Sequence, residues 1–365
     1  MLGTSPTALG GVAGVVRTYE ASGLFARWPI TYLATHTDGS FGRKILVLFG
    51  AYGVFARWLV AHRPFVLHVH ASSRNSFWRK ATFMLPALAC KIPVVLHMHG
   101  GEFERFYAKE CGPLRKHLVR FLVTRCERVA VLSSSSREYI KRMSLATTVE
   151  VIANPVMSYQ TNDSERSTVD KTILFLGRLE ESKGVFVLLD ALAMLKLQHP
   201  RVRLICGGNG DLSKVWAYVT SLGLQEHVVL KGWVDEPTKV ALLNTATIFA
   251  LPSFAEGMPM CVLEAMSAGL PVVATPVGGL PDAIEDGRQG LIVPAGDAKA
   301  LSQAVSLLLD DASLRTDMGR SARQRFEEVY FADKALAKLE DIYRTLGVSP
   351  RSQGEVERRS ATVGG

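Results

Sequence analysis

A repeating pattern runs along almost the whole chain: a short apolar run, a turn rich in glycine or polar residues, and then a stretch of helical character. Apolar runs of this length predict strands buried on both faces, as in a parallel sheet. The runs fall at 65–70, 93–98, 129–133, 149–153, 172–176, 203–206, 228–234, 248–251, 271–275 and 290–294. Strands that alternate with helices predict doubly wound α/β domains. A chain of 365 residues is long enough for two of them.

The domain boundaries follow from composition. The sequence turns polar from Met157 to Asp170, which predicts a linker (157–170) between an N-terminal domain (1–156) and a C-terminal domain (171–330). We expect the helix at 331–346 to pack back on the N-terminal domain. The tail at 347–365 is polar and rich in Gly, Ser and Arg, which predicts disorder.

Charge is unevenly distributed between the two halves. Residues 1–150 hold 20 Lys and Arg against 8 Asp and Glu, a net of +12, whereas the remainder carries a net of −4. A basic N-terminal half indicates an anionic partner, either nucleic acid or a membrane surface. No nucleic-acid motif is present, so we expect no nucleic-acid partner. The five cysteines show no metal or disulfide spacing, and no signal peptide is recognisable, so we expect a cytoplasmic protein.

Two stretches of the basic half have membrane-like composition. The apolar stretch 45–61 contains Arg57 and is short for a bilayer span, which predicts a buried or interface-lying helix. In 72–80, the cations Arg74, Arg79 and Lys80 surround Phe77 and Trp78, a composition that suits a membrane interface. A solvated helix start with snorkelling arginines also explains the second stretch and is the slightly favoured interpretation.

The most informative stretch of the C-terminal half is 248–266. A buried strand at 248–251 is followed by a loop with Glu256, Gly257 and Met258, and then by a helix that carries Glu264 one turn inside. The carboxyl end of a strand facing a helix N-terminus is where α/β sheets bind anions and nucleotides. Carboxylates are strong acceptors for sugar hydroxyls, although a helix with two ordinary acids fits the spacing as well.

The ends of other strands in this half also carry residues that could bind a phosphate or a nucleotide base. Arg178 and Lys183 follow the strand at 172–176, where two cations can neutralise a diphosphate. Gly208 follows the next strand, and Trp233 is either a wall for a nucleotide base or a packed core aromatic. Asp297 is placed to cap the helix after the last strand.

Two further candidates lie in the N-terminal half. Gly10 and Gly11 open a helix, where backbone N–H groups can approach a phosphate or a sugar, although a flexible start has the same appearance. His97 and His99 alternate onto one side of a strand, and His99 adjoins two glycines at its carboxyl end. We favour an active-site role for His99 over a structural one, and we discount a His-x-His metal site because no third ligand is spaced to complete it.

Together these motifs resemble the retaining glycosyltransferases of family 4, from Gly10 to about Leu346. The most specific is the E-x7-E pattern from Glu256 to Glu264, supported by Gly177-Arg178-Leu179 with Lys183-Gly184, by Gly10-Gly11 and by His99-Gly100-Gly101. The resemblance implies the GT-B architecture, two facing Rossmann-like domains with a cleft between them. The chain departs from the family in having only Met1-Leu2 before the glycine loop, where members have a full first strand.

The resemblance also implies roles. Glu256 would contact the transferred sugar, Glu264 the ribose, and Arg178 and Lys183 the diphosphate, with His99 in the active site. The donor site would further include Gly10, Gly11, Gly208, Trp233, Gly257 and Met258. The combination of the His97–Phe103 and Asn75–Lys80 segments is similar to members that build exopolysaccharide or lipid-linked repeat units.

We therefore predict transfer of a hexose from a UDP- or GDP-sugar to a lipid-linked saccharide, at the inner face of the cytoplasmic membrane. The sequence contains no Asp-x-Asp, so we expect no metal and no other cofactor. A nucleotide-sugar epimerase or hydrolase of the same fold, or a non-enzymatic nucleotide-sugar-binding protein, would carry the same donor motifs.

Overall fold

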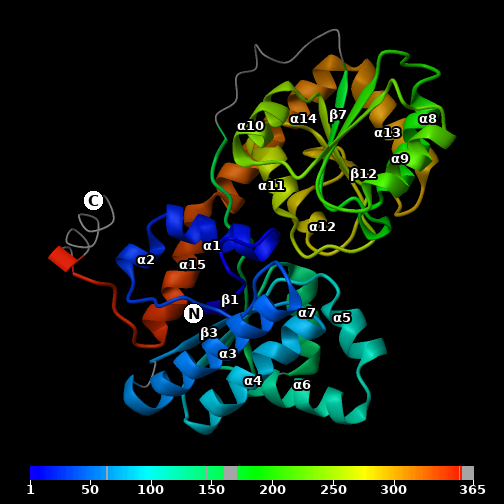
Figure 1. Ribbon diagram of the computed structural model, residues 1–365. Helices are drawn as coiled ribbons and strands as arrows, with labels where there is room; N and C mark the ends of the chain where they lie inside the picture. Colours follow the sequence, from blue (N-terminus) through cyan, green and yellow to red (C-terminus); the bar gives the residue numbers. More distant parts are fainter. Residues whose placement is uncertain (63–64, 145, 160–170, 353, 356–365) are drawn as a thin grey trace. The chain divides into compact units, whose positions relative to one another are not determined.

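The computed structural model describes residues 1–62, 65–144, 146–159, 171–352 and 354–355. The chain forms two compact units, unit 1 (Met1–Pro155 with Ala332–Gly365) and unit 2 (Val156–Phe331) (Figure 1). Most of the predicted linker, residues 160–170, lies outside the described residues, as do 353 and 356–365 of the predicted tail.

Unit 1 is built on a six-stranded parallel sheet in the order β2-β1-β3-β4-β5-β6. Its strands are β1 (Leu2–Gly3), β2 (Leu33–Ala34), β3 (Leu67–Ala71), β4 (Val94–Met98), β5 (Arg128–Val131) and β6 (Thr148–Val151). Every residue of β3 and β4 is buried, as the unbroken apolar runs predict. The first strand is only two residues long, yet it pairs with both β2 and β3.

The helices of unit 1 connect these strands. They are α1 (Gly11–Ala21), α2 (Leu24–Arg27), α3 (Phe41–Arg57), α4 (Asn75–Ala89), α5 (Phe103–Arg105), α6 (Pro113–Arg125), α7 (Ser134–Met143) and α15 (Ala332–Thr345), with π-helical turns η1 (Trp58–His62) and η2 (Phe106–Glu110). From α15, Tyr343 reaches the sheet and hydrogen-bonds His68 of β3 at 2.6 Å. Within the segment predicted to be disordered, the Arg351 guanidinium donates to the Trp28 carbonyl at 2.6 Å.

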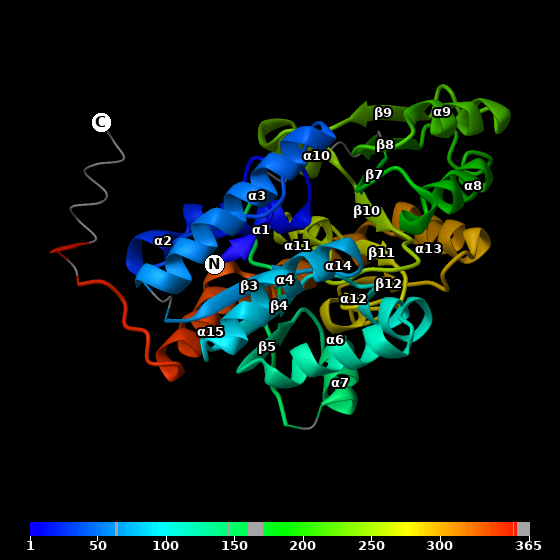
Figure 2. The ribbon, with the colours of Figure 1, turned by 60° about the horizontal axis from the view of Figure 1, so that its bottom comes forward.

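Unit 2 contains the second six-stranded parallel sheet, in the order β12-β11-β10-β7-β8-β9, which Figure 2 shows edge to edge. Its strands are β7 (Thr172–Leu176), β8 (Arg203–Gly207), β9 (Val228–Gly232), β10 (Ile248–Leu251), β11 (Val272–Ala274) and β12 (Gly290–Ile292). Counted from the first strand of the unit, this is the 3-2-1-4-5-6 order of a dinucleotide-binding Rossmann fold. The prediction of two doubly wound α/β domains is thereby confirmed.

Among the described helices of unit 2, four begin at an aspartate whose side chain accepts from a backbone N–H of the first turn. The helices of the unit are α8 (Val185–Leu195), α9 (Leu212–Ser221), α10 (Glu236–Thr245), α11 (Met260–Ser267), α12 (Leu280–Ala283), α13 (Ala298–Asp310) and α14 (Ala312–Arg325), with a 3-10 turn η4 (Glu181–Lys183) and a π-helical turn η5 (Phe326–Tyr330). Asp297 accepts from the Ala300 N–H at 2.8 Å, which confirms its predicted capping role. Pro259 is the N-cap of α11, directly before its first helical residue Met260.

Candidate active site

Strand order locates the candidate donor site in unit 2. The order reverses between β7 and β10, the first and fourth strands of the unit, and ligands of open α/β sheets bind outside the carboxyl ends of the strands at such a switch point. The loop after β7 carries Arg178 and Lys183, and the loop after β10 carries Glu256. The two loops are joined by the Phe254 N–H, which donates to the Ser182 carbonyl at 2.9 Å.

Glu256 forms a buried ion pair with Lys183 at this switch point. Its side chain is 6% exposed, and Oε1 accepts from Lys183 Nζ and from Ser253 Oγ, each at 2.7 Å. A carboxylate this deeply buried needs such partners, because desolvation of an unpaired charge is costly. The structure thus brings together two residues that the sequence places 73 positions apart.

Glu264 forms a second buried pair on α11. Its Oε1 accepts from Lys239 Nζ of α10 at 2.7 Å and from the Tyr159 hydroxyl at 3.4 Å. Burial lowers the pKa of Lys239, but the carboxylates of Glu264 and Glu236 outweigh burial and raise it overall, so the lysine stays charged. A hydroxyl ligand approaching Glu264 would therefore meet a carboxylate held in a fixed orientation.

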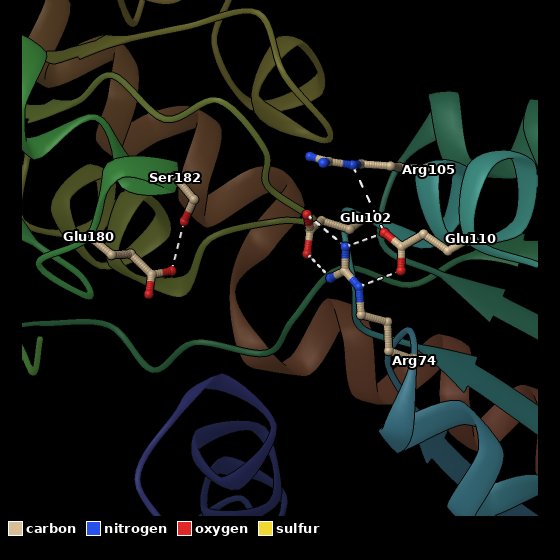
Figure 3. Close-up of polar contacts among 6 residues, drawn as sticks. All are labelled: Arg74, Glu102, Arg105, Glu110, Glu180 and Ser182. Atoms are coloured by element: carbon tan, nitrogen blue, oxygen red, sulfur yellow. Dashed lines mark hydrogen bonds and ion pairs between the residues drawn. The ribbon is translucent and has the colours of Figure 1, made fainter.

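Arg178 differs from Lys183 in exposure. Its side chain is 71% exposed and its Nε lies 3.1 Å from Glu180 Oε2, while Glu180 also accepts from Ser182 Oγ at 2.7 Å (Figure 3). An exposed ion pair is weak, so the guanidinium can leave Glu180 for a stronger anion such as a diphosphate.

Two glycines allow neighbouring loops to pack closely on these two, Gly208 after β8 and Gly278 after β11. Gly208 has φ +148°, and a Cβ there would lie 1.7 Å from the Gly177 carbonyl oxygen. Gly278 has φ +58°, and a Cβ there would lie 1.9 Å from the Glu256 carbonyl oxygen. Both positions require glycine for space as well as for conformation.

The remaining donor candidates of unit 2 have different surroundings. Met258 is buried, Trp233 is 47% exposed directly after β9, and Gly257 accepts from the Gly279 N–H at 2.6 Å through its carbonyl. Trp233 is thus a surface aromatic and not a core residue, whereas Met258 packs beneath the loop.

In unit 1 the strand order reverses between β1 and β3, which places Gly10 and Gly11 near a second switch point. Gly10 has φ +126° and is the N-cap of α1, and Gly11 is the first residue of that helix. No neighbouring atom would contact a Cβ added at either glycine, so the space above the helix start is open.

His99 follows β4 and has both ring nitrogens engaged within unit 1. Nδ1 donates to Asn154 Oδ1 at 3.1 Å, and Nε2 accepts a hydrogen bond from the Nδ1–H of His70 at 2.7 Å. Burial lowers the pKa of His99 to about 4, against the opposing effect of the Asn154 hydrogen bond. His99 is therefore a neutral imidazole at pH 7, which suits a fixed hydrogen-bonding or positioning group and not a proton reservoir.

His99 is one end of a stack of four imidazoles. His68 and His70 alternate along β3, and His97 lies opposite His70 in the β3–β4 register. Ring centroids of neighbouring members lie 4.3 to 5.1 Å apart, with interplanar angles of 25° to 29°. Burial is the main cause that lowers the pKa of His68, His70 and His97 well below the ordinary value, so the stack is uncharged.

The stack brings three candidate metal ligands together. Ligand nitrogens of His68, His70 and His97 lie within 4.8 Å of one another, a group that includes only one member of the His97-x-His99 pair considered from the sequence. The geometry still fits a metal poorly. Nearly parallel rings direct their lone pairs side by side, whereas a tetrahedral ion needs them to converge, and His68 Nδ1 is already bonded to Tyr343.

The cations predicted to face a membrane have mostly internal partners. Arg74 ion-pairs with Glu102 and places its Nη2 2.6 Å from Glu110 Oε1 (Figure 3). It has φ 54°, an uncommon value for a residue with a side chain.

For Lys80 the prediction is wrong. Lys80 is 1% exposed and donates to Thr35, and burial lowers its pKa to about 7. Arg79 is half-buried, and Trp78 packs between Phe77, Phe106 and the guanidinium of Arg115. Helix α4 packs on β3, so Phe77 and Lys80 on its inner side are buried, whereas the Arg74 side chain remains 40% exposed.

Sequence reasoning missed four residues of the two sites: Lys239, Ser253, His70 and Asn154. Ser253 follows the same strand as Glu256, His70 lies on the strand next to the one that precedes His99, and Asn154 follows β6. Each thus lies at or near the carboxyl end of a strand, a signal that could have found it. Lys239 lies in the first turn of α10, where a single lysine is a weaker signal.

Comparison with known proteins agrees with this architecture. Residues 15–157 match the model of Glycosyltransferase Family 4, and residues 160–325 match that of Glycosyl transferases group 1. The structure is similar to that of Anabaena HepE in complex with UDP-glucose, with a TM-score of 0.74, 18% identity, and coverage of 94% of this chain and 98% of that one. Two doubly wound units with buried acid–lysine pairs at a switch point are thus the GT-B fold, and the chain belongs to the family 4 glycosyltransferases.

Curated relatives are similar mainly in part of their length. One is the D-inositol 3-phosphate glycosyltransferase of Corynebacterium aurimucosum, 37% identical over 180 residues, 47% of this chain and 42% of that protein. Another is the phosphatidyl-myo-inositol mannosyltransferase of Mycobacterium leprae, 35% identical over 184 residues, 49% of this chain and 48% of that protein. The matched region thus spans less than half the length of these relatives.

Proposed function

We propose that the chain is a retaining glycosyltransferase that moves a hexose from a UDP- or GDP-sugar to a lipid-linked saccharide, in cell-surface or exopolysaccharide synthesis. The observation that carries the proposal is the Lys183–Glu256 pair at the switch point of a Rossmann-ordered sheet. A cation there can face a diphosphate while the adjacent carboxylate accepts hydroxyls of the sugar.

The reaction would proceed without a covalent sugar–enzyme intermediate. The bond between the anomeric carbon and the diphosphate oxygen breaks, and a bond to the acceptor oxygen forms on the same face of the ring. The acceptor proton passes to the departing phosphate oxygen. Arg178 and Lys183 would neutralise the charge that develops on the diphosphate, and no metal is required for that task.

The lipid-linked acceptor is supported by the basic charge of residues 1–150 and by the relative that is named for a phosphatidyl-inositol acceptor. The other relative is named for a soluble inositol phosphate, so a small phosphorylated acceptor is the second candidate. In the first case the enzyme would work as a peripheral protein at the cytoplasmic face of the membrane.

Thermal shift against UDP- and GDP-sugars tests the donor, followed by product analysis with and without candidate acceptors. We expect one nucleotide class to stabilise unit 2 and product to require an acceptor. Acceptor-independent conversion of the donor would instead indicate an epimerase or hydrolase, and binding without turnover would indicate a nucleotide-sugar-binding protein.

A further inference from the structure

The helix α3 of unit 1 exposes a mainly apolar face. Among the described residues, the segment 41–61 is the one helix long and apolar enough to cross a membrane, and only 11% of its most apolar window is buried. Large apolar side chains on its open side are strongly exposed: Phe41 by 78%, Leu46 by 74%, Phe49 by 67% and Val60 by 88%. An apolar surface of this extent on a folded domain marks an interaction site.

The opposite side of the helix is fixed to unit 1. Ala51 and Phe55 are buried, and the Phe55 ring packs edge-on against Phe83 of α4 at 5.3 Å, so α3 and α4 lie side by side (Figure 1). This inner stripe completes the core. The outer face makes no comparable contribution, so the fold of unit 1 does not explain its composition.

The helix cannot span a bilayer while this packing holds. The strands before and after it, β2 and β3, both pair in parallel with β1. Both ends of the segment are thus held by one sheet and its middle packs on the same unit, so lipid cannot surround it. A helix in this position can lie in the plane of a membrane surface.

The positive charge around the helix favours an anionic surface as its partner. No Asp or Glu occurs from Gly39 to Gly101, a stretch that contains 8 Lys and Arg. Arg43 and Lys44 lie in the first turn of α3 and Arg57 is its last residue, so cations border the apolar face at both ends. A second copy of the chain docked by the same face would bring like charges together, whereas anionic headgroups would neutralise them.

We propose that the outer face of α3 and η1 docks unit 1 on an anionic bilayer, with Phe41, Leu46, Phe49 and Val60 inserted below the headgroups and Arg43, Lys44 and Arg57 at the phosphates. The docking surface is therefore α3, and not the start of α4 that the sequence indicated. This inference deepens the proposed function, because docking would bring unit 1 to a lipid-linked substrate. It rests on the proposed function only for the identity of that acceptor.

Co-sedimentation of the full chain with vesicles tests the proposal. One set is phosphatidylcholine alone, and the other contains equal parts of phosphatidylcholine and phosphatidylglycerol. We expect binding to the anionic vesicles, weakened but not abolished by salt because apolar insertion is not screened. Equal recovery with both sets, or no binding to either, would overturn the proposal.

Matched variants separate insertion from charge. Leu46→Gln with Phe49→Gln should lower partitioning roughly a hundredfold, given the apolar area removed. Arg43→Gln with Lys44→Gln should lower it about five-fold for each cation lost. The controls are Leu197→Gln, at an 81% exposed position of unit 2, and the exposed pair Arg201→Gln with Arg203→Gln, all of which should bind as the parent does.

Two further measurements keep the outcomes distinct. Sedimentation velocity without lipid identifies a dimer, and a dimer abolished by Leu46→Gln with Phe49→Gln would assign the face to a second copy and refute the membrane. Thermal shift with the nucleotide sugar should be unchanged in every α3 variant. Loss of vesicle binding in an α3 variant that still binds the nucleotide sugar supports docking through α3, independently of the proposed function. If the parent protein binds no nucleotide sugar, the proposed function is wrong, whatever the vesicle assay shows.

Discussion

Both parallel sheets bury polar side chains near their carboxyl ends, but these side chains are charged in unit 2 and neutral in unit 1. In unit 2 the polar groups buried at the sheet end are charged and paired, as Glu256 with Lys183 and Glu264 with Lys239. In unit 1 they are four stacked histidines that burial keeps neutral, closed by Tyr343 and Asn154. Under the proposed function, the charged groups of unit 2 would contact the diphosphate and the sugar, whereas the neutral imidazoles of unit 1 add no net charge to their end of the sheet. The contrast predicts how each unit responds to mutation and pH.

The largest effect is expected at Lys183. Lys183→Ala should cut turnover by roughly two to three powers of ten, as does removal of one transition-state donor. It should also destabilise unit 2 by about 3 kcal/mol, because it leaves the buried Glu256 carboxylate unpaired. Arg178→Ala should cut turnover similarly without loss of stability, since its side chain is 71% exposed. Steady-state kinetics and chemical denaturation measure both quantities.

Two outcomes would contradict that assignment. Near-normal turnover in both single variants would remove the cations from the mechanism. A Lys183→Ala protein as stable as the parent would show that the buried pair does not hold the loop. Lys183→Ala combined with Glu256→Gln serves as the control, because removal of both charges should restore most of the stability.

Acidification should affect unit 1 first. The unfolded chain protonates His99 near the ordinary pKa of 6.5, whereas the folded chain resists protonation down to about 4. The stability from this group is complete above pH 6.5 and is lost as the pH falls from 6.5 toward 4, by roughly 3 kcal/mol. The lowered pKa values of His68, His70 and His97 add to the loss.

Hydrogen exchange of peptides from β4 and β7 at pH 7 and pH 5 measures that difference. We expect protection in β4 to fall while that in β7 is retained. An equal fall in both peptides would show that the histidine stack is not what makes unit 1 sensitive to acid.

The stability cost of removing a single hydrogen bond should also be larger in unit 2 than in unit 1. Ser253→Ala removes a donor to the Glu256 carboxylate and should cost about 2 kcal/mol, whereas Tyr343→Phe removes a neutral bond to His68 and should cost about 1 kcal/mol. Denaturant titration of the two variants compares the costs. A larger cost for Tyr343→Phe would show that the neutral stack is the more tightly coupled of the two networks.

The smallest effect is expected from chelation. Activity should survive EDTA, since lysine and arginine are proposed to neutralise the leaving group and the histidine rings are poorly directed for a metal. Loss of activity on chelation, restored by magnesium or manganese, would refute the metal-free mechanism. Restoration by zinc together with loss of metal content in His68→Phe would assign the ion to the stack.

The fold could be predicted almost entirely from the pattern of apolar runs, because burial on both faces of a parallel strand leaves a local signature. Arg178, Lys183 and Glu256 could be proposed from the sequence for a similar reason, because each lies between a strand and the next α-helix, while Glu264 lies one turn inside such a helix. What the sequence does not indicate is which of these charges form pairs. Nothing in it indicates that Lys239, in the first turn of another helix, neutralises Glu264.

The sequence by itself predicted ten of the twelve strands among the described residues, missing the two-residue strands β1 and β2. It also determined which loops carry charge and the resemblance to the family 4 glycosyltransferases, which the family models confirm. The tertiary structure alone decided which side chains are exposed and which are buried. It buried Lys80 of the expected membrane patch, exposed α3, and joined His68 and His70 to His97 and His99 in one stack. The physical reason is that strand periodicity is local, whereas burial and pairing depend on which strands become neighbours. That order is set by the packing of the whole sheet.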